Sequence, residues 1–209
     1  MEHSFNIIEF NCQLHQMAAI FNKEDRSGLH DYLHGRKCQL SALQSAHQAM
    51  FSKAAEFVLS LTSLLPINNH AFSKPVHLAS LMSYILENAI IFTGTGFSID
   101  YRKVLVTHGF LPRAEVAHAK PGSGCINFAW TNYSKRRIGS RNDKAILVAY
   151  SESLNKCVYT VDTARRCDEE AIMEVLQFHG DKVQTWLSFI STKGTFISDS
   201  VYAGEVTVT

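Results

Sequence analysis

The sequence predicts an α+β protein in which a helical N-terminal region precedes an antiparallel β-sandwich. Apolar residues recur at three- and four-residue spacing over residues 41–65, which is the pattern of one stripe on a helix. A second run of this kind begins near Pro75. Beyond Cys125, short apolar segments alternate with turn residues at the spacing of a small sandwich. We therefore expect a helical region with an extended arm over residues 1–110 and a sandwich over residues 111–209.

The first predicted helix runs from Ser41 to Leu65, which is about seven turns. Ser41 and Gln44 have the spacing of a capping box, and Pro66 ends the run. A helix with so wide an apolar face needs a partner surface, so we expect this helical face to make contacts. The residues of the stripe are Leu43, Ala46, Met50, Ala54, Phe57, Leu61 and Leu64.

A second helix is predicted from Pro75, with Ser73 as its cap. Proline is tolerated in the first turn because its missing N–H has no partner within the helix there. Gly94 and Gly96 are expected to stop this helix. The linker over residues 67–74 is short, so the two helices are expected to form an antiparallel hairpin. The stripe of the second helix is Leu78, Leu81, Met82, Ile85 and Ala89.

The strands are predicted from alternating or continuous apolar residues. Residues 144–150 are apolar almost without interruption, which is typical of a strand covered on both faces. Residues 97–106 are expected to be extended and to add a strand to the sandwich or to a separate small sheet. The predicted strands of the sandwich are 126–131, 144–150, 157–162, 171–176, 183–191 and 201–208.

Composition and charge indicate an ordinary globular protein. Hydrophobic residues make up 46% and charged residues 19%, which argues against wholesale disorder. The net charge of +1 provides no field that would recruit nucleic acid, so we do not expect a nucleic-acid partner. No apolar run approaches the length of about 18 residues that a bilayer requires, so we expect no membrane insertion.

The cysteines and the first residues favour a cytoplasmic protein or a component of an assembled particle. The five cysteines include no Cys-x-x-Cys pair, which favours reduced thiols over a disulfide framework. One bridge between Cys125 and Cys157 stays open as an alternative. The residues after Met1 show neither the basic region nor the apolar region of a secretory signal, so we expect none.

The predicted sandwich follows the residue order of a known module. Trp130 lies in its second strand, Tyr150 ends its third, and a turn at Gly180 precedes the next strand. The last strand follows the step Ser198-Asp199-Ser200. The C-terminal part therefore resembles a fibronectin type III module, which is an immunoglobulin-like sandwich. It departs from that pattern where Val183 stands in place of the tyrosine-corner residue.

A second resemblance rests on short strings spread over residues 40–208. The strings are Asp100-Tyr101, Leu111-Pro112, Phe128-Ala129-Trp130-Thr131, Asp143 to Tyr150, Val158-Tyr159 and Asp199-Ser200-Val201-Tyr202. Through them the chain resembles domain-of-unknown-function family 6266, which is widespread in Bacteroidota bacteria. The resemblance implies a helical region followed by a sandwich and implies no activity, because none is established for the family. Residues 1–38 do not match the Gly/Lys/Trp/Arg-rich opening of that family.

A metal site has one set of candidates. His30, His34 and Cys38 stand four residues apart, so a helix would align them, and Cys12 and His15 would complete a zinc set. Glycines within this segment oppose a continuous helix, and the His-Glu-x-x-His pattern is absent. We therefore expect ordinary surface or packing histidines and no metal.

Two features are candidates for interaction with a partner. A basic cluster lies in one loop between strands and would contact phosphates or an acidic partner, or be a solvated loop. Four aromatic residues of the strands are expected to be core or half-buried, namely Trp130, Trp186, Phe189 and Tyr202. If one of them is exposed, we expect it to be Trp186, because it lies opposite the apolar face of its strand. Asp168-Glu169-Glu170 is expected to be a solvated turn. The basic cluster is Lys135, Arg136, Arg137, Arg141 and Lys144.

No catalytic constellation or cofactor motif is recognised in the sequence. Gly94-Thr95-Gly96 and Gly122-Ser123-Gly124 lack the third glycine and the strand-to-helix context of a phosphate-binding loop. We therefore predict a non-enzymatic structural or interaction protein without a cofactor. We expect it to belong to a larger assembly, such as a virion-like particle or an appendage, that it joins through its helical face and sandwich. The alternative is a module that binds a glycan or another ligand through Trp186 or Tyr202.

Overall fold

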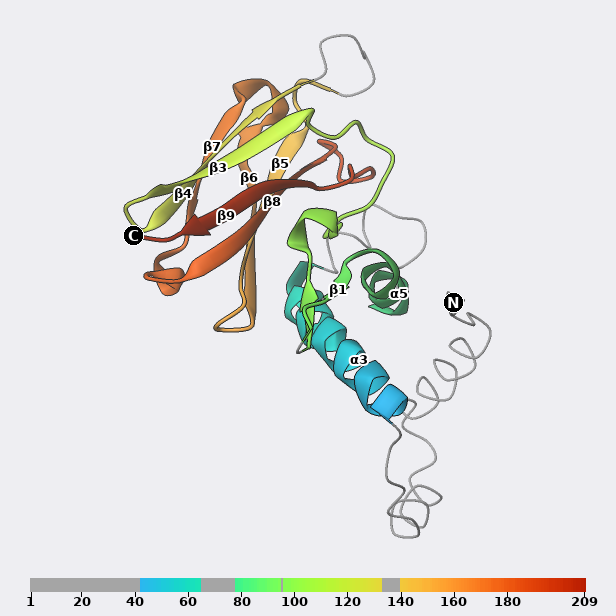
Figure 1. The fold of residues 1–209 in the computed structure, drawn as a ribbon. Coiled ribbons are helices and arrows are strands. Elements are labelled where there is room, and N and C mark those ends of the chain that lie inside the picture. The colour runs from blue at the N-terminus through green and yellow to red at the C-terminus, as the bar shows by residue number, and fades with distance from the viewer. Residues whose placement is uncertain (1–41, 65–77, 95, 133–139) are drawn as a thin grey trace, which may run out of the picture. The chain divides into compact units, whose positions relative to one another are not determined.

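A helical layer and three antiparallel sheets, of two, three and four strands, make up the described part of the chain (Figure 1). The computed structural model describes residues 42–64, 78–94, 96–132 and 140–209, and residues 42–209 form one unit. The prediction of a helical region followed by antiparallel sheets is confirmed.

The helical layer consists of α3 (Ala42–Ser60), the short 3₁₀ helix η1 (Leu61–Leu64) and α5 (Leu78–Asn88). The first predicted helix is confirmed almost to its last residue. The stripe is buried from Ala54 onward, whereas Ala46 and Met50 are only half-buried. The predicted start of the second helix at Pro75 and its cap at Ser73 lie outside the described residues.

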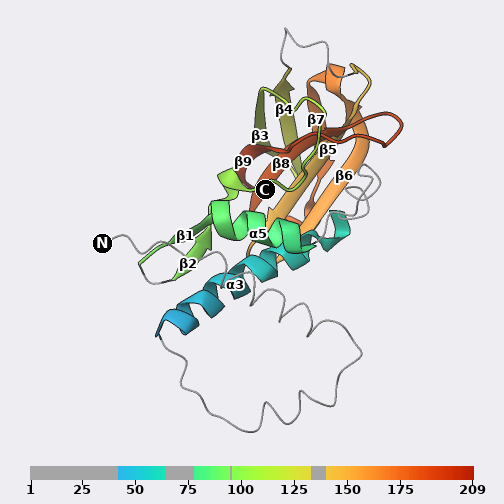
Figure 2. The same cartoon turned by 90° about the vertical axis from the view of Figure 1, so that its right-hand side faces the viewer.

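The second helix ends earlier than its glycines suggest, and a β-hairpin follows it. Strand β1 (Ile90–Phe92) pairs with β2 (Phe97–Ile99) beside α3 (Figure 2). The expectation that Gly94 stops the helix is wrong: the helix ends at Asn88, because the β-branched and aromatic residues after it favour a strand. Gly94 instead has a φ of +88° in the hairpin turn, a conformation that glycine adopts without strain.

The sandwich consists of a three-stranded and a four-stranded sheet. The three-stranded sheet has the order β3-β4-β7 and the four-stranded sheet the order β6-β5-β8-β9, and every neighbouring pair is antiparallel. Short 3₁₀ helices η2 (Tyr101–Lys103), η3 (Arg166–Asp168) and η4 (Leu176–Phe178) lie in the connections. The strands are β3 (Val116–Gly122), β4 (Cys125–Thr131), β5 (Lys144–Ser151), β6 (Lys156–Arg165), β7 (Glu170–Glu174), β8 (Lys182–Ile190) and β9 (Val201–Thr207).

Each predicted strand of the sandwich is confirmed, but strand β3 of the sandwich was not predicted. Strand β3 contains two alanines and Pro121, residues that are depleted in strands. Proline is tolerated here because β3 lies at the edge of its sheet. Of the predicted extended segment 97–106, residues 97–99 supply a strand to the separate two-stranded sheet, which was one of the two alternatives. Residues 101–103 form the 3₁₀ helix η2 instead.

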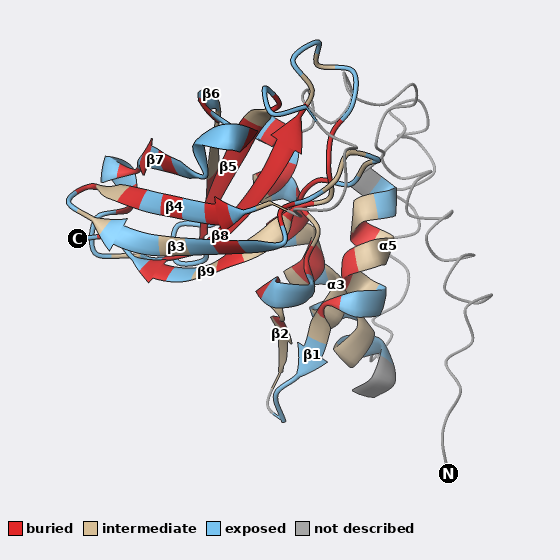
Figure 3. Cartoon of the chain, turned by 90° about the horizontal axis from the view of Figure 1, so that it is seen from above, coloured by how far each residue is buried: buried red, intermediate tan, exposed pale blue. Residues whose placement is uncertain are grey.

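Two hydrophobic clusters lie on opposite faces of the four-stranded sheet. Between the sheets, Phe128 and Trp130 of β4 pack with Leu147 of β5. On the other face, Ile146 and Val148 of β5 pack with the helical layer, which includes Phe57. Strand β5 is therefore covered on both faces, as predicted (Figure 3).

Candidate functional site: a groove beside helix α5

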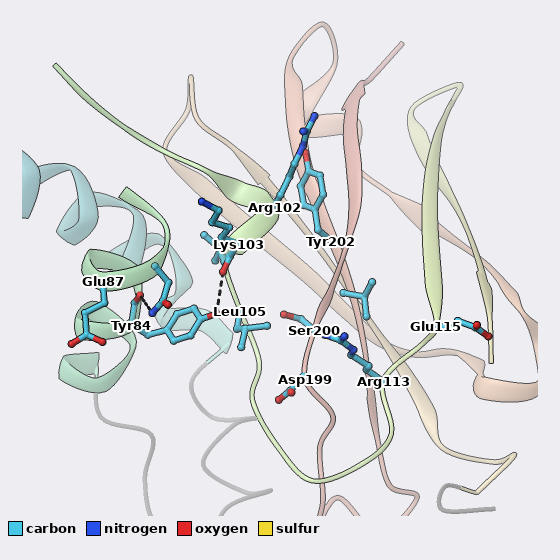
Figure 4. Close-up of a pocket in the computed structure, with 13 residues that line it drawn as sticks. Tyr84, Glu87, Arg102, Lys103, Leu105, Arg113, Glu115, Asp199, Ser200 and Tyr202 are labelled. Carbon is cyan, nitrogen blue, oxygen red and sulfur yellow. Dashed lines mark hydrogen bonds between the residues drawn. The ribbon is translucent and has the colours of Figure 1, made fainter. Parts of the chain in front are cut away.

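A groove of about 690 Å³ lies between α5 and the start of β9 (Figure 4). It is formed by segments far apart in the sequence: the last turn of α5, η2 and the residues after it, the approach to β3, and the residues around the start of β9. Its lining residues are Tyr84, Glu87, Asn88, Arg102, Lys103, Val104, Leu105, Arg113, Glu115, Asp199, Ser200, Val201 and Tyr202. Sequence analysis missed this site because its parts meet only in the folded chain.

Hydrogen bonds hold one wall of the groove in place. The Tyr84 hydroxyl donates to the carbonyl oxygen of Lys103 at 3.1 Å, which ties α5 to the end of η2. The Asn88 side chain donates to the carbonyl oxygen of Tyr84 at 2.9 Å. Asp100 caps η2 by accepting from the Arg102 amide at 3.3 Å. This wall is therefore positioned before any ligand binds.

The opposite wall is held by Asp199 and Ser200. The Ser200 hydroxyl oxygen accepts from the Val106 amide at 3.0 Å. Asp199 Oδ1 accepts from the Gly109 amide at 3.0 Å and lies 2.7 Å from His108 Nδ1. The Asp199 carboxylate is thus used to hold the backbone. No hydroxyl or thiol of the described residues is hydrogen-bonded to His108.

The groove presents charged groups of both signs that form no ion pair with a described residue. Neither Arg102 nor Arg113 forms a salt bridge with any described residue, and both are exposed. The carboxylates of Glu87 and Glu115 are likewise exposed and outside every salt bridge of the described residues. Lys103 differs, because its Nζ lies 3.6 Å from Asp100 Oδ2. These groups remain available to a ligand.

Tyr202 connects the groove to the core beneath it. Its ring stands edge-on to the Trp186 ring at a centroid distance of 5.8 Å, and its hydroxyl donates to Gln184. Burial and the carboxylate of Glu205 raise the pKa of the Tyr202 hydroxyl, and the positive charge of Arg102 opposes that rise. Tyr202 is only half-buried, so part of it faces the groove.

Trp186 is a core residue, as the favoured interpretation had it, so its choice as an interaction residue in case of exposure is wrong. Its exposed fraction is 0%, and its ring contacts those of Phe57, Tyr101 and Tyr202. The physical reason is the helical layer: a residue that points away from the sandwich core enters a second core under the helices. Trp186 is therefore a packing residue of that second core.

The predicted basic cluster lies only partly within the described residues. Lys135, Arg136 and Arg137 lie outside them, as do the metal candidates His30, His34 and Cys38 and their proposed complements Cys12 and His15. Arg141 is exposed, whereas Lys144 forms an ion pair with Asp162. The described part of the chain therefore brings no two members of the cluster together as a binding site.

A buried ion pair that the sequence did not reveal lies next to this segment. Arg166 Nη2 stands 3.1 Å from Asp143 Oδ2, and both side chains are at most 9% exposed. The Arg166 guanidinium also lies over the Phe189 ring at 3.8 Å. The carbonyl oxygen of Arg166 accepts from the indole N–H of Trp130 at 3.1 Å. These contacts have a structural role: they hold together one end of the sandwich, which we call its closed end.

Three further findings concern the described residues alone. Cys125, Cys157 and Cys167 are free thiols, so the alternative of a bridge between the first two is not realised. No group of three or more His, Cys, Asp or Glu side chains is placed to hold a metal ion there. Within those same ranges, neither helix combines the length and the apolar character needed to cross a bilayer.

The comparisons with known proteins identify a family and no characterised relative. The model of a family of unknown function, DUF6266, matches residues 30–204. This match confirms the family resemblance drawn from the sequence. No curated protein matches the chain.

Proposed function

Because the chain belongs to DUF6266, a family of unknown function, we propose its function from the structure: a non-enzymatic interaction protein within a larger assembly. In this proposal, the groove beside α5 holds a segment of a partner chain. The observation that carries the proposal is a set of exposed charges of both signs that form no ion pair with a described residue. They lie between two walls that the chain's own hydrogen bonds fix. Preorganised walls reduce the ordering cost of binding.

The chemistry of the groove favours an extended protein segment. Its volume of about 690 Å³ lies within the range of about 300–1,000 Å³ that is usual for ligand sites. Its lining is charged, whereas small-molecule sites are mostly apolar. Arg102 and Arg113 suit carboxylates of a partner, and Glu87 suits its lysine or arginine. An extended segment with both kinds of charge satisfies all three residues.

The arrangement of the sandwich also supports a role in binding. We take the sandwich to be immunoglobulin-like. If strands β3 to β9 are lettered A, B, C, C′, E, F and G, the two sheets become A-B-E and C′-C-F-G. This order supports the resemblance to a fibronectin type III module. Modules of this architecture are common in cell-surface proteins, although a fold alone assigns no function.

A selection from a library of random peptides on the full-length protein tests this proposal. We expect enriched peptides of mixed charge whose dissociation constants, measured by fluorescence anisotropy, rise about tenfold or more in Arg102→Ala and in Arg113→Ala. Arg141→Ala is the matched control, because Arg141 is equally exposed and lies outside the groove. Failure to enrich any peptide, or peptides that bind all of these proteins equally, would contradict the proposal.

A second candidate function is glycan binding in the same groove. The observation that favours it is the presence of two tyrosines, Tyr84 and Tyr202, in the lining. Trp186 contributes nothing to this function, because it is fully buried. A glycan array probed with the full-length protein tests it. Binding of one glycan class that is lost in Glu87→Gln, together with an empty peptide selection, would favour this candidate over the first.

A further inference from the structure

The outer face of the three-stranded sheet carries a lysine and a histidine on one edge strand and two glutamates on the other. On β3 the exposed side chains include His118 and Lys120, and on β7 they include Glu170 and Glu174. Between them, the exposed residues of β4 are short and uncharged. Figure 3 shows the alternation of exposed and buried residues along these strands. The face therefore has a basic side, a neutral middle and an acidic side.

These charges do not neutralise one another within one chain. His118 stands opposite Ala129 of β4, and Ala129 in turn stands opposite Glu170 of β7. Because neighbouring strands are about 4.8 Å apart, the two edges are separated by about 10 Å. No salt bridge or side-chain hydrogen bond of the described residues involves His118, Lys120, Glu170 or Glu174.

A second copy of the chain that faced the first would pair the β3 edge of each copy with the β7 edge of the other. A rotation by 180° about an axis parallel to β4, between two facing sheets, places β3 of each copy over β7 of the other. The rotation leaves the level along the strands unchanged, so His118 of one copy comes to the level of Glu170 of the second copy. Lys120 comes to the level of Ile172, beside Glu174. The same patch thus complements itself, as a two-fold interface requires.

We infer that the outer face of β3, β4 and β7 is a surface for self-association whose occupant is a second copy of this chain. Ile172 and Val116 add apolar contact, since their exposed fractions are 61% and 41%. The contact is small: three strands of seven residues or fewer cover about 14 Å by 23 Å. This is below the area of about 800 Å² per partner that stable complexes bury, so the association is weak and salt-dependent.

This inference extends the proposed function and does not depend on the groove. The groove is formed by α5, η2 and the approaches to β3 and β9, whereas the self-association surface uses the outward residues of β3, β4 and β7. A substitution at either place leaves the other side chains untouched. Failure of peptide binding and failure of self-association are therefore separate results.

A charge-swap experiment tests the inference by sedimentation velocity on the full chain. His118→Glu with Lys120→Glu gives a face with two acidic edges, and Glu170→Lys with Glu174→Lys gives one with two basic edges. We expect wild-type protein to self-associate at low salt, and each variant to do so about tenfold less or not at all. An equimolar mixture of the two variants is expected to associate at least as tightly as wild type, because each face now complements the other.

The control is Lys156→Glu, which reverses an exposed charge on β6 and is expected to leave the association unchanged. Thermal unfolding of every variant checks that the fold is intact, as expected for exposed positions. Three results would each overturn the inference: wild-type protein that stays monomeric up to about 1 mM at low salt, variants that associate as wild type does, or a variant mixture that fails to associate.

Discussion

The two sheets of the sandwich differ in how many of their faces the chain itself covers. Strand β5 in the four-stranded sheet is buried along nearly its whole length, with one cluster on each face. Strand β4 in the three-stranded sheet alternates buried and exposed residues, because only its inner face is covered. The helical layer is the cause of this difference. The difference indicates that the surfaces left for partners lie on the three-stranded sheet and at the rim of the helical layer.

The two tryptophans illustrate the same difference. Trp130 lies between the sheets, and its indole N–H donates to the carbonyl oxygen of Arg166 at 3.1 Å. Trp186 lies under the helices, where its indole N–H has no hydrogen-bond partner among the described residues. Trp186 is therefore held in the second core by ring packing, without a hydrogen bond to a described residue. Removing one ring from the second core is the most direct test of this difference between the two sheets.

Replacing Phe57 by Ala should produce the largest loss of stability. Phe57 of α3 is 1% exposed, and its ring lies 4.8 Å from that of Tyr150 and 6.2 Å from that of Trp186. Deleting a buried phenyl ring costs about 3–5 kcal/mol, from lost burial and from the cavity left behind. Urea unfolding of the full chain, followed by tryptophan fluorescence, measures this loss.

Leu59→Ala is the matched control on the same helix. Leu59 is 61% exposed, so its truncation should change the free energy of unfolding by about 0.5 kcal/mol or less. Similar losses in both variants would mean that α3 does not present one face to the four-stranded sheet. The difference between the two faces of that sheet would then lose its explanation.

The next largest loss of stability is expected for Asp143→Asn, at the closed end of the sandwich. This substitution keeps the size of the side chain but removes the charge that faces the buried guanidinium of Arg166. A buried charge without its partner costs about 3 kcal/mol. The free energy of unfolding in urea measures it, with the exposed Arg141→Ala as a control. A loss below about 1 kcal/mol would show that solvent screens this pair as it screens surface pairs.

Much of the fold could be predicted because burial leaves a periodic pattern in the sequence. The continuous apolar run of β5 predicted a strand covered on both faces, and the stripe of α3 predicted the buried residues from Ala54 to Leu64. Strand β3 was missed for a physical reason: it lies at an edge and packs small residues such as Ala117 inward, which gives little apolar signal. Strand β1 of the hairpin after α5 was missed because the glycines that follow it also suit a helix end.

The candidate site could not be predicted in the same way. Tyr84, Arg102 and Arg113 line one groove although they come from three separate segments, and each alone reads as a surface residue. Trp186 stayed a candidate for interaction because alternation along β8 tells which residues face the sandwich core but not whether the other face is covered. Such sites depend on tertiary contacts that leave no local pattern.

A smaller loss of stability is expected at alkaline pH, and it comes from a thiol in the second core. Burial raises the pKa of the Cys157 thiol from its ordinary value of 9.0 to about 12. The unfolded chain therefore loses this proton at lower pH than the folded chain does. The contribution of the thiol to stability is complete below pH 9 and is lost as pH rises from 9 toward 12.

Urea unfolding at pH 7 and pH 10 measures this effect. Wild-type protein should lose about 1 kcal/mol more between these two pH values than Cys157→Ala does. Cys167→Ala is the control, because Cys167 is exposed and should leave the wild-type pH dependence intact. An equal pH dependence in wild type and Cys157→Ala would show that the thiol is not enclosed by the second core.

The smallest effect on stability is expected where the chain leaves a face open, in Ile172→Thr. Ile172 is 61% exposed on the outer face of β7, and threonine suits a strand equally well, so the free energy of unfolding should change by about 0.5 kcal/mol or less. The same substitution at Ile146, which is fully buried in β5, should cost several times more because it places a hydroxyl in an apolar cluster. Comparable losses at the two positions would show that the outer face of the three-stranded sheet is covered as well.

A loss of stability confined to the Ile146 variant, together with weaker self-association of Ile172→Thr in sedimentation velocity, would mean that isoleucine stabilises the fold on one sheet and the assembly on the other.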